Sequence, residues 1–374
     1  TIYDDQNREA PCMIKKDGIY YLFTSQAAGW YPSTSMYSSA PSLIGPWSEL
    51  RTIGSTSTFS AQSGGIIHLK GDYGDNYVMI ANRWMFGWKD ATKPVAEQRM
   101  LPISFANGFA FFDFYENVLY NGDKGTVIPV QNGKLLSQDK PSTGSTNSAT
   151  ASSANDGVYQ TEWVASNIWP STWSVDLGAA SNLSNIQISW YMMKGSEAYY
   201  QYTVEGSIDG VTYTTLLDKS TGYNDYGFTV DSLSGIARYV RVALVNAKLQ
   251  NNTSNWYTPQ LYEVKVFGEP VIVAKPVIKT NPVNKCGIVN NGVVSVKLNT
   301  ATSGAAIYYT INNTEPDINS TLYDSEFEIK NTLVAGQTVI VKAITVFAGI
   351  SSQVEKKIIT FKPLKKIHQH HDQH

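Results

Sequence analysis

Charged residues, cysteine and histidine are all scarce in this chain of 374 residues. Charged side chains make up 16% of it, and 29 basic against 31 acidic residues leave a formal net charge of -2. Sparse and balanced charge argues against a nucleic-acid-binding protein, whose affinity rests on clustered Lys and Arg. The two cysteines, Cys12 and Cys286, fall in different predicted domains, which excludes a disulfide scaffold, a zinc ribbon and a C-x-x-C redox site.

Histidine is nearly confined to the end of the chain. Only His68 lies inside the folded part, in a strand-like alternation, so we interpret it as a strand residue rather than as the base of a Ser-His-Asp triad. The tail, residues 364–374, is expected to be frayed or an expression remnant, with weak metal binding as the alternative. The other four histidines are His368, His370, His371 and His374.

Long apolar runs are also missing. No segment reaches the ~18 apolar residues of a membrane span, so no membrane span is expected. A signal peptide is not recognisable, and the chain begins with Thr1 rather than Met. We therefore expect the start to be a processed terminus or a cut within a longer protein.

What the chain does contain is 42% hydrophobic and 12% aromatic residues, enough to build cores. Short runs rich in Val, Ile, Tyr and Thr recur between Gly, Asn and Ser clusters, and helical periodicity is almost absent. This pattern predicts an all-β protein. Two composition shifts, one Ser/Thr-rich and one Pro-punctuated, predict the domain boundaries. The expected parts are residues 1–130, residues 131–268, a linker at 269–275, residues 276–363 and the tail.

A carboxylate stands just ahead of a proline near the start, in Glu9-Ala10-Pro11, and a strand, an Asp17-Gly18 pair and a second strand follow. Asp-Gly between alternating residues predicts a hairpin. Proline is tolerated only at a strand edge or start, so Glu9 is expected at the end of an inner strand. The spacing alone also fits a surface glutamate that precedes a proline.

Five further motifs follow in order: residues 29–32, the Gly45-Pro46-Trp47 ending, residues 59–65, residues 82–84 and residues 98–103. With the first motif they resemble glycoside hydrolase family 43, a family of five-bladed propellers, and most of all its exo-β-1,3-galactanase branch. The resemblance covers about the first 120 residues. Asn82 and Met100 depart from it, since an Asp and a Trp are common there.

The resemblance implies an inverting glycosidase in which Glu9 is the general acid, a role suited to a carboxyl whose pKa is raised by shielding. It implies Gln62 as the equivalent of the base, acting through an imidic-acid tautomer or by positioning the water. The alternative is a glutamine that binds sugar hydroxyls. In an inverting pair the two groups are expected roughly 6.5–9.5 Å apart. Trp30, Tyr31 and Trp84 are candidate stacking platforms for sugars, with core packing as the competing interpretation.

Blade number limits this interpretation. A closed propeller needs about four to eight blades, whereas roughly 125 residues are enough for only two to two and a half blades. We therefore expect the chain to be the C-terminal part of a longer enzyme and to be inactive by itself.

The middle part carries Asn155-Asp156-Gly157, Gln160 to Trp163, residues 173–178, residues 202–213, residues 237–242 and residues 261–268. This series resembles the discoidin, or coagulation-factor type C, jelly roll, which includes carbohydrate-binding module family 32. The resemblance implies a structural Ca²⁺ held by Asp156, Thr161 and Glu263, with a metal-free turn as the alternative. Trp169, Tyr223 and Trp256 are candidate sugar contacts, whereas Trp163 and Trp173 are expected in the core.

The last part, about residues 285–362, resembles the chitobiase/β-hexosaminidase C-terminal domain, a small β-sandwich, and is interpreted as a spacer. Together the sequence predicts part of a secreted or periplasmic, bacterial-type, monomeric exo-β-1,3-galactanase that acts on arabinogalactan polysaccharide through accessory domains. A non-catalytic carbohydrate-binding or adhesion protein is the alternative. No nucleic-acid partner is expected.

Overall fold

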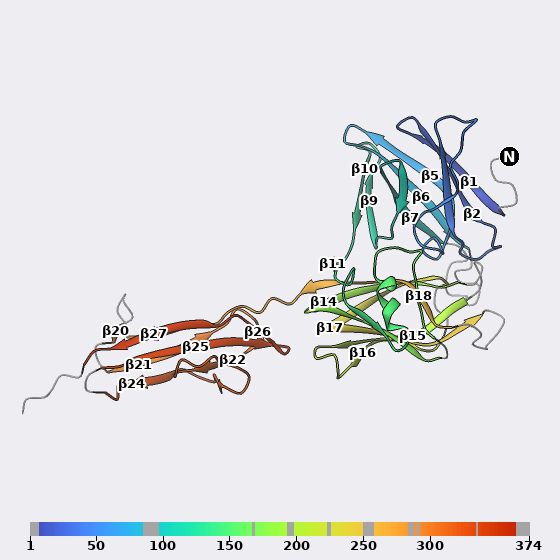
Figure 1. Ribbon diagram of the computed structural model, residues 1–374. Helices are drawn as coiled ribbons and strands as arrows, with labels where there is room; N and C mark the ends of the chain where they lie inside the picture. The colour runs from blue at the N-terminus through green and yellow to red at the C-terminus, as the bar shows by residue number, and fades with distance from the viewer. Residues whose placement is uncertain are drawn as a thin grey trace, which may run out of the picture. The chain divides into compact units, whose positions relative to one another are not determined.

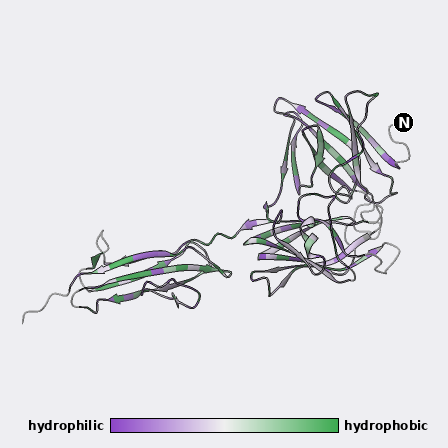
Figure 2. Cartoon of the chain, viewed as in Figure 1, coloured by the Kyte–Doolittle hydropathy of each residue, from purple (hydrophilic) through white to green (hydrophobic). Residues whose placement is uncertain are grey.

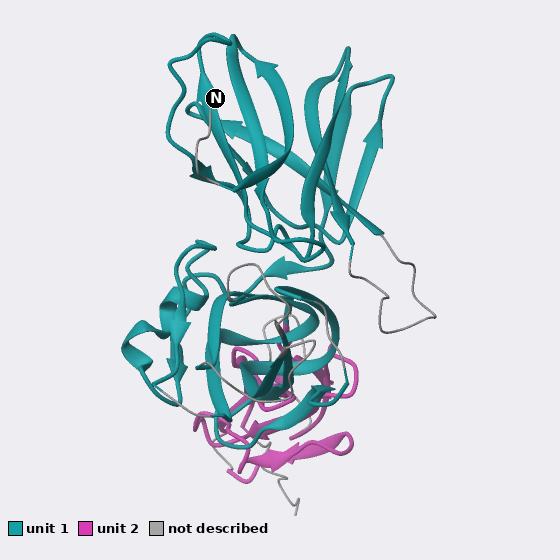
Figure 3. Cartoon of the chain, turned by 90° about the vertical axis from the view of Figure 1, so that its right-hand side faces the viewer, with its two compact units in different colours: residues 1–270 teal, residues 271–374 magenta. Residues whose placement is uncertain are grey.

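The computed structural model describes residues 7–84, 97–166, 169–192, 198–222, 226–249, 258–282, 288–289, 292–333 and 336–363. Within these ranges the regular elements are all strands apart from one short 3₁₀ helix, η1 (Ser148–Ala154), so the all-β prediction is confirmed (Figure 1). The chain divides into two compact units, Thr1–Pro270 and Val271–His374, coloured teal and magenta in Figure 3. No helix of the described residues is long and apolar enough to cross a membrane.

Two four-stranded antiparallel sheets open the first unit, and in each the strands pair in chain order. The first sheet contains β1 (Arg8–Lys16), β2 (Ile19–Gln26), β3 (Ser35–Ala40) and β4 (Arg51–Thr52). The second contains β5 (Gln62–Gly71), β6 (Gly74–Arg83), β7 (Glu97–Ala106) and β8 (Phe109–Phe112). Such four-stranded sheets are the building blocks of propeller blades. The predicted hairpin between β1 and β2 is confirmed, and its turn residues Asp17 and Gly18 both have the positive φ of a type I′ turn.

A two-stranded hairpin, β9 (Asn117–Asn121) and β10 (Thr126–Val130), docks on the turn between β5 and β6. The Asn76 side-chain amide donates to the Gly125 carbonyl at 2.8 Å. Gly125 has a φ of +68°, and a Cβ there would stand 2.3 Å from the Gly71 nitrogen and 2.3 Å from the Gly74 carbonyl oxygen. Only glycine allows the two backbones to approach this closely.

Gly125→Ala is therefore expected to destabilise the first unit by about 1–3 kcal/mol, the range for overpacking a close contact. Thermal unfolding of the variant would measure the loss. Gly122→Ala in the same turn is the matched control, because a Cβ at Gly122 meets nothing within 4 Å. Equal melting temperatures for the two variants would contradict the close approach.

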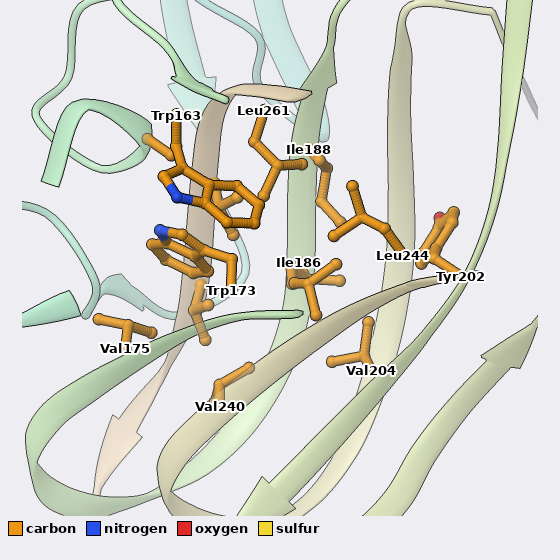
Figure 4. Packing of buried hydrophobic residues seen from close by; sticks show 14 of the residues in the cluster. Trp163, Trp173, Val175, Ile186, Ile188, Tyr202, Val204, Val240, Leu244 and Leu261 are labelled. Atoms are coloured by element: carbon orange, nitrogen blue, oxygen red, sulfur yellow. The ribbon is translucent and has the colours of Figure 1, made fainter. Parts of the chain in front are cut away.

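An eight-stranded antiparallel sheet, bent on itself, completes the first unit. It contains β11 (Lys134–Leu135), β12 (Ser142–Gly144), β13 (Trp163–Val164), β14 (Ser171–Trp190), β15 (Ala198–Ser207), β16 (Thr214–Lys219), β17 (Phe228–Leu249) and β18 (Gln260–Pro270). Two register shifts in the β14–β17 pairing let these long strands curve around a core. Trp163 and Trp173 lie fully buried in that core, as expected from the sequence (Figure 4).

A second hydrophobic cluster joins the two opening sheets to the eight-stranded sheet, β11 to β18, which is called the jelly roll below. It contains Phe59 and Phe112 from the first part of the chain together with Tyr159 and Phe228 from the jelly-roll part. Because this cluster runs across residue 130, the first two predicted parts lie in one compact unit.

The second unit contains a three-stranded and a six-stranded sheet. The former contains β19 (Val277–Asn281), β21 (Val293–Asn299) and β24 (Phe327–Lys330); the latter contains β20 (Ile288–Val289), β22 (Ala306–Thr310), β23 (Thr321–Leu322), β25 (Thr338–Phe347), β26 (Ile350–Ser351) and β27 (Glu355–Phe361). Figure 2 shows hydrophobic and hydrophilic residues alternating along these strands. Val296 of one sheet and Val341 of the other are fully buried in a shared core, so this unit is a β-sandwich.

Candidate functional site

Glu9 lies at the start of β1, where the strand bulges. The pairing with β2 shifts register between Glu9 and Cys12, and Ala10 adopts a left-handed φ of 48°. Pro11 has no N–H to donate, which the interrupted ladder tolerates. A bulge bends its strand and changes the direction of the side chains beside it, and bulges are frequent next to active sites. Here it sets the half-buried Glu9 opposite Ser25 of β2.

Gln62, the first residue of β5, meets Glu9 from the second sheet. Its Nε2 donates to Glu9 Oε1 at 2.7 Å and to Ser25 Oγ at 3.0 Å. Its Oε1 accepts the indole N–H of Trp84 at 2.6 Å. An indole N–H can only donate, so Trp84 fixes which end of the Gln62 amide is the oxygen. Gln62 is thus held by hydrogen bonds at both ends, with only 9% of its surface exposed.

The contact between Glu9 and Gln62 differs from the separation expected of an inverting pair. Two carboxylates repel and stay apart, whereas a neutral amide can donate directly to a carboxylate. At 2.7 Å between Gln62 Nε2 and Glu9 Oε1, no attacking water fits between these atoms. The separation of roughly 6.5–9.5 Å, which would favour an enzyme over a non-catalytic protein, is therefore not found for this pair. The roles of Glu9 as acid and of Gln62 as a positioning group remain predictions.

Two tryptophans extend this contact, since Trp84 donates to Gln62 and Trp30 packs against Trp84. Trp30 is 56% exposed, and its ring meets the edge of the half-buried Trp84 ring with centroids 5.5 Å apart. An exposed indole offers a flat apolar face, which the C–H groups of a sugar ring can cover. The polar N–H of Trp84 instead donates a hydrogen bond to Gln62. Tyr31 packs edge-on against Tyr226 of the jelly-roll part, with centroids 5.9 Å apart.

Ser25 and Arg8 also belong to the site, although the sequence analysis did not single them out. Arg8 donates to the Thr24 and Thr34 carbonyls at 2.7 and 3.0 Å and so secures the start of β1 beside Glu9. No sequence signal marks Ser25, because it lies opposite Glu9 only through the register shift at the bulge.

The three predicted calcium ligands come together in the jelly roll. Thr161 Oγ1 lies 3.0 and 2.9 Å from the two carboxylate oxygens of Asp156. Glu263 Oε2 accepts the Gly157 N–H at 3.1 Å, which ties β18 to the same loop. The Val158 carbonyl oxygen is 2.8 Å from Thr161 Oγ1 and adds a further oxygen.

The chemistry of these groups fits calcium, which takes six to eight oxygens from carboxylates, hydroxyls and carbonyls. Glu263 is 1% exposed, and its Oε1 is buried without a hydrogen-bond partner. The Asn155 Oδ1 is buried in the same way. Burial raises the pKa of Glu263 to about 8, because the Lys265 ammonium and the Gly157 N–H offset only part of the cost of removing its charge from water. No group of three or more His, Cys, Asp or Glu side chains gathers in the described ranges, so the ligand shell would depend on main-chain and hydroxyl oxygens.

Of the remaining sugar-contact candidates, only Trp169 lies among the described residues. Trp169 is half-buried, packs against the jelly-roll core and lies 6.0 Å from the Tyr200 ring, so much of its surface is taken up by packing. Tyr223 and Trp256 lie outside the described residues.

Two domain families match the chain. The NedA-like, galactose-binding domain of the factor 5/8 type C group matches residues 153–242, and the chitobiase/β-hexosaminidase C-terminal domain matches residues 286–356. The first match lies in the jelly roll, and the second lies in the C-terminal sandwich. The comparison with curated proteins gave no match.

Solved structures with similarity to the chain include exo-β-1,3-galactanases and sugar-binding modules. The enzyme of Phanerochaete chrysosporium with β-1,3-galactotriose is 17% identical, with a TM-score of 0.40, over 71% of this chain and 58% of its own. The enzyme of Clostridium thermocellum is 18% identical, with a TM-score of 0.32, over 64% and 58%. A chitosan-binding module of Paenibacillus sp. IK-5 with chitotriose is 23% identical, with a TM-score of 0.30, over 36% and 99%. The chain thus spans little more than half of the galactanases, and at these scores the similarities do not decide its function.

Proposed function

We propose that the chain is the propeller end of a secreted, monomeric glycoside hydrolase that cleaves β-1,3-galactan of the arabinogalactan type. The observation that carries this proposal is the Glu9 carboxyl, which a bulge sets at the start of an inner strand, hydrogen-bonded to Gln62 and flanked by Trp30 and Trp84. The galactose-binding domain supports a carbohydrate partner. In this proposal the jelly roll assists binding and the C-terminal sandwich is a spacer.

Glu9 acts as the general acid. Its Oε1 accepts the N–H of Gln62, so a neutral Glu9 carries its proton on Oε2 and donates it from there to the glycosidic oxygen. Gln62 is a positioning residue, because both ends of its amide are already bonded. The two four-stranded sheets of the described residues are two blades in this proposal, whereas propellers need about four to eight. The water-activating base of this proposal therefore comes from further blades, and the chain by itself is inactive.

Hydrolysis of β-1,3-galactan by the protein with its full propeller tests the catalytic role of Glu9. Glu9→Gln is expected to lower kcat by about 10²–10⁴, the contribution of a general acid, while substrate still binds. Galactose release measures the rate. Glu49→Gln, at a loop position away from the Glu9–Gln62 contact, is the control. Unchanged kcat in the Glu9 variant would refute the assignment.

Sugar binding through Trp30 is tested separately on the chain itself. Trp30→Ala is expected to weaken binding of β-1,3-galactotriose by about tenfold, equivalent to roughly 1.4 kcal/mol, in calorimetric titration. The exposed Tyr73 serves as the matched control, because Tyr73→Ala removes an aromatic side chain that is 76% exposed and lies on the β5–β6 turn. Equal affinities for the two variants would remove Trp30 from the site.

A non-catalytic carbohydrate-binding protein is the second candidate. The direct contact between Glu9 and Gln62 favours it, since an acid engaged by an amide is also a fixed hydrogen-bonding group for sugar hydroxyls. Binding of galactotriose with no hydrolysis by the full protein would select this function.

We also propose that the jelly roll holds a structural Ca²⁺ through Asp156, Thr161 and Glu263, with the Val158 carbonyl among the further ligands. The buried, unpartnered Glu263 Oε1 supports this assignment. When bound, the ion would supply positive charge beside a buried carboxylate. The loop and β18 would then be linked through a common ligand shell.

A further inference from the structure

The turn directly ahead of Gln62 is strained. Three consecutive residues, Thr58, Phe59 and Ser60, have left-handed φ values of 47°, 55° and 64°. The Ala61 N–H donates to the Ser57 carbonyl at 3.0 Å, so they form one turn of left-handed helix. Such a conformation costs about 1–2 kcal/mol per residue outside glycine and persists only where its surroundings enforce it.

The two opening four-stranded sheets hold one side of this turn. Thr58 Oγ1 donates to the Ser33 carbonyl at 2.6 Å and accepts the Ser35 N–H at 3.1 Å. Arg99 Nε donates to the Phe59 carbonyl at 3.2 Å. Residues 57–61 are almost completely buried, which removes water as an alternative partner.

The jelly roll holds the other side. The fully buried Phe59 ring meets the edges of Phe228 and Tyr159, with centroids 5.0 and 5.3 Å apart. The Gln160 amide donates to the Gly54 carbonyl at 3.1 Å. The backbone also approaches closely, since a Cβ on Gly227 would stand 2.5 Å from the Ser57 Cβ.

We infer that the jelly roll is a structural part of the candidate site, and that Phe59, clamped by Phe228 and Tyr159, is a positioning residue for Gln62. The strained turn ends one residue before Gln62, whose amide bonds both Glu9 and Trp84. Relaxation of the turn would therefore move the amide that holds the Glu9 carboxyl. The effect on catalysis rests on the proposed function. The effect of the clamp on the position of Gln62 does not depend on that function.

Phe228→Leu tests the clamp without leaving a large cavity, because it removes the ring edge and keeps most of the apolar volume. The readouts are the nuclear magnetic resonance signals of the Trp84 indole N–H and of the Gln62 side-chain amide, recorded without sugar. Both signals are expected to shift. Exchange of the indole hydrogen is expected to quicken by up to roughly tenfold, the factor that about 1.4 kcal/mol produces.

Phe105→Leu is the matched control, since Phe105 belongs to the same cluster but its ring contacts are Tyr21 and Tyr77. It is expected to leave both signals in place. If Phe228→Leu does not fold, Gln160→Ala removes only the bond from an exposed side chain to Gly54 and is expected to shift the same signals by less.

Unmoved Trp84 and Gln62 signals in the folded variant, or equal shifts in Phe105→Leu, would overturn the inference. A wild-type protein that neither binds nor hydrolyses galactan, with the signals behaving as expected, would count against the proposed function alone.

Discussion

Trp173→Ala is expected to destabilise the first unit by about 3–5 kcal/mol, the cost of deleting a large aromatic side chain from a core. Trp173 is fully buried and lies in one cluster with Trp163 (Figure 4). Its indole N–H also donates to the Ala151 carbonyl at 2.9 Å, so the substitution leaves that buried carbonyl without its donor. Thermal or urea unfolding measures the loss, which corresponds to a fall in Tm of roughly 6–20 °C.

Val211→Ala provides the comparison, because Val211 is 82% exposed in the same jelly roll. Its effect is expected to stay within about 0.5 kcal/mol, as for most surface substitutions. A loss below about 1 kcal/mol for Trp173→Ala would mean that the core collapses around the cavity, which tightly packed interiors rarely allow.

Removal of calcium is expected to lower the melting temperature of the first unit and to leave that of the second unit unchanged. If free Ca²⁺ is a hundredfold above its Kd, binding contributes about 2.7 kcal/mol. Scanning calorimetry with and without a chelator measures the difference. The second unit is an internal control, since its sandwich contains none of the three proposed ligands.

Glu263→Gln sharpens this experiment, because it replaces a buried carboxylate by a neutral side chain of the same shape. With chelator at neutral pH, the variant is expected to be more stable than the wild type, since metal-free Glu263, with its pKa near 8, must take up a proton or bury its charge on folding, and both are costly. With Ca²⁺, the order should reverse, because the variant loses a charged ligand. Asp123→Asn, at an exposed turn, should show neither effect. A constant difference between Glu263→Gln and wild type would reject the metal.

The hairpin near Glu9 shows how far sequence reasoning reaches. Asp17-Gly18 correctly predicts the turn, and counting back from it pairs Glu9 with Gln26. The bulge at Ala10 moves the pairing by one residue, so Glu9 stands opposite Ser25 instead. A bulge depends on what the strand packs against, and local propensity does not encode it. The contact between Glu9 and Gln62 was likewise beyond reach, because it joins two sheets.

The jelly-roll core was more predictable. Trp163 and Trp173 are expected in the core from the resemblance to the discoidin jelly roll, and Trp173 also lies at an alternating buried position of β14, which is a local signal. Phe59 carried no such signal, since it lies in a Ser/Thr-rich loop and its importance comes from Tyr159 and Phe228, which are distant in sequence. Long-range packing of this kind explains why the boundary expected near residue 130 lies inside one compact unit.

The ion pair between Lys265 and Asp113 has a consequence for how this architecture can be recombined. Lys265 is only 8% exposed, whereas Asp113 is 34% exposed and also accepts the Tyr159 hydroxyl, so the pair is partly open to water where the opening sheets meet the jelly roll. A jelly roll exchanged for a homologue without this lysine would leave the carboxylate of Asp113 without its cation, at a cost of up to about 1 kcal/mol, because Asp113 is partly hydrated. Domain swaps at residue 130 should therefore lose some stability unless Asp113 is neutralised in the same step. Exchanges at residue 271, between the two units, leave this pair intact.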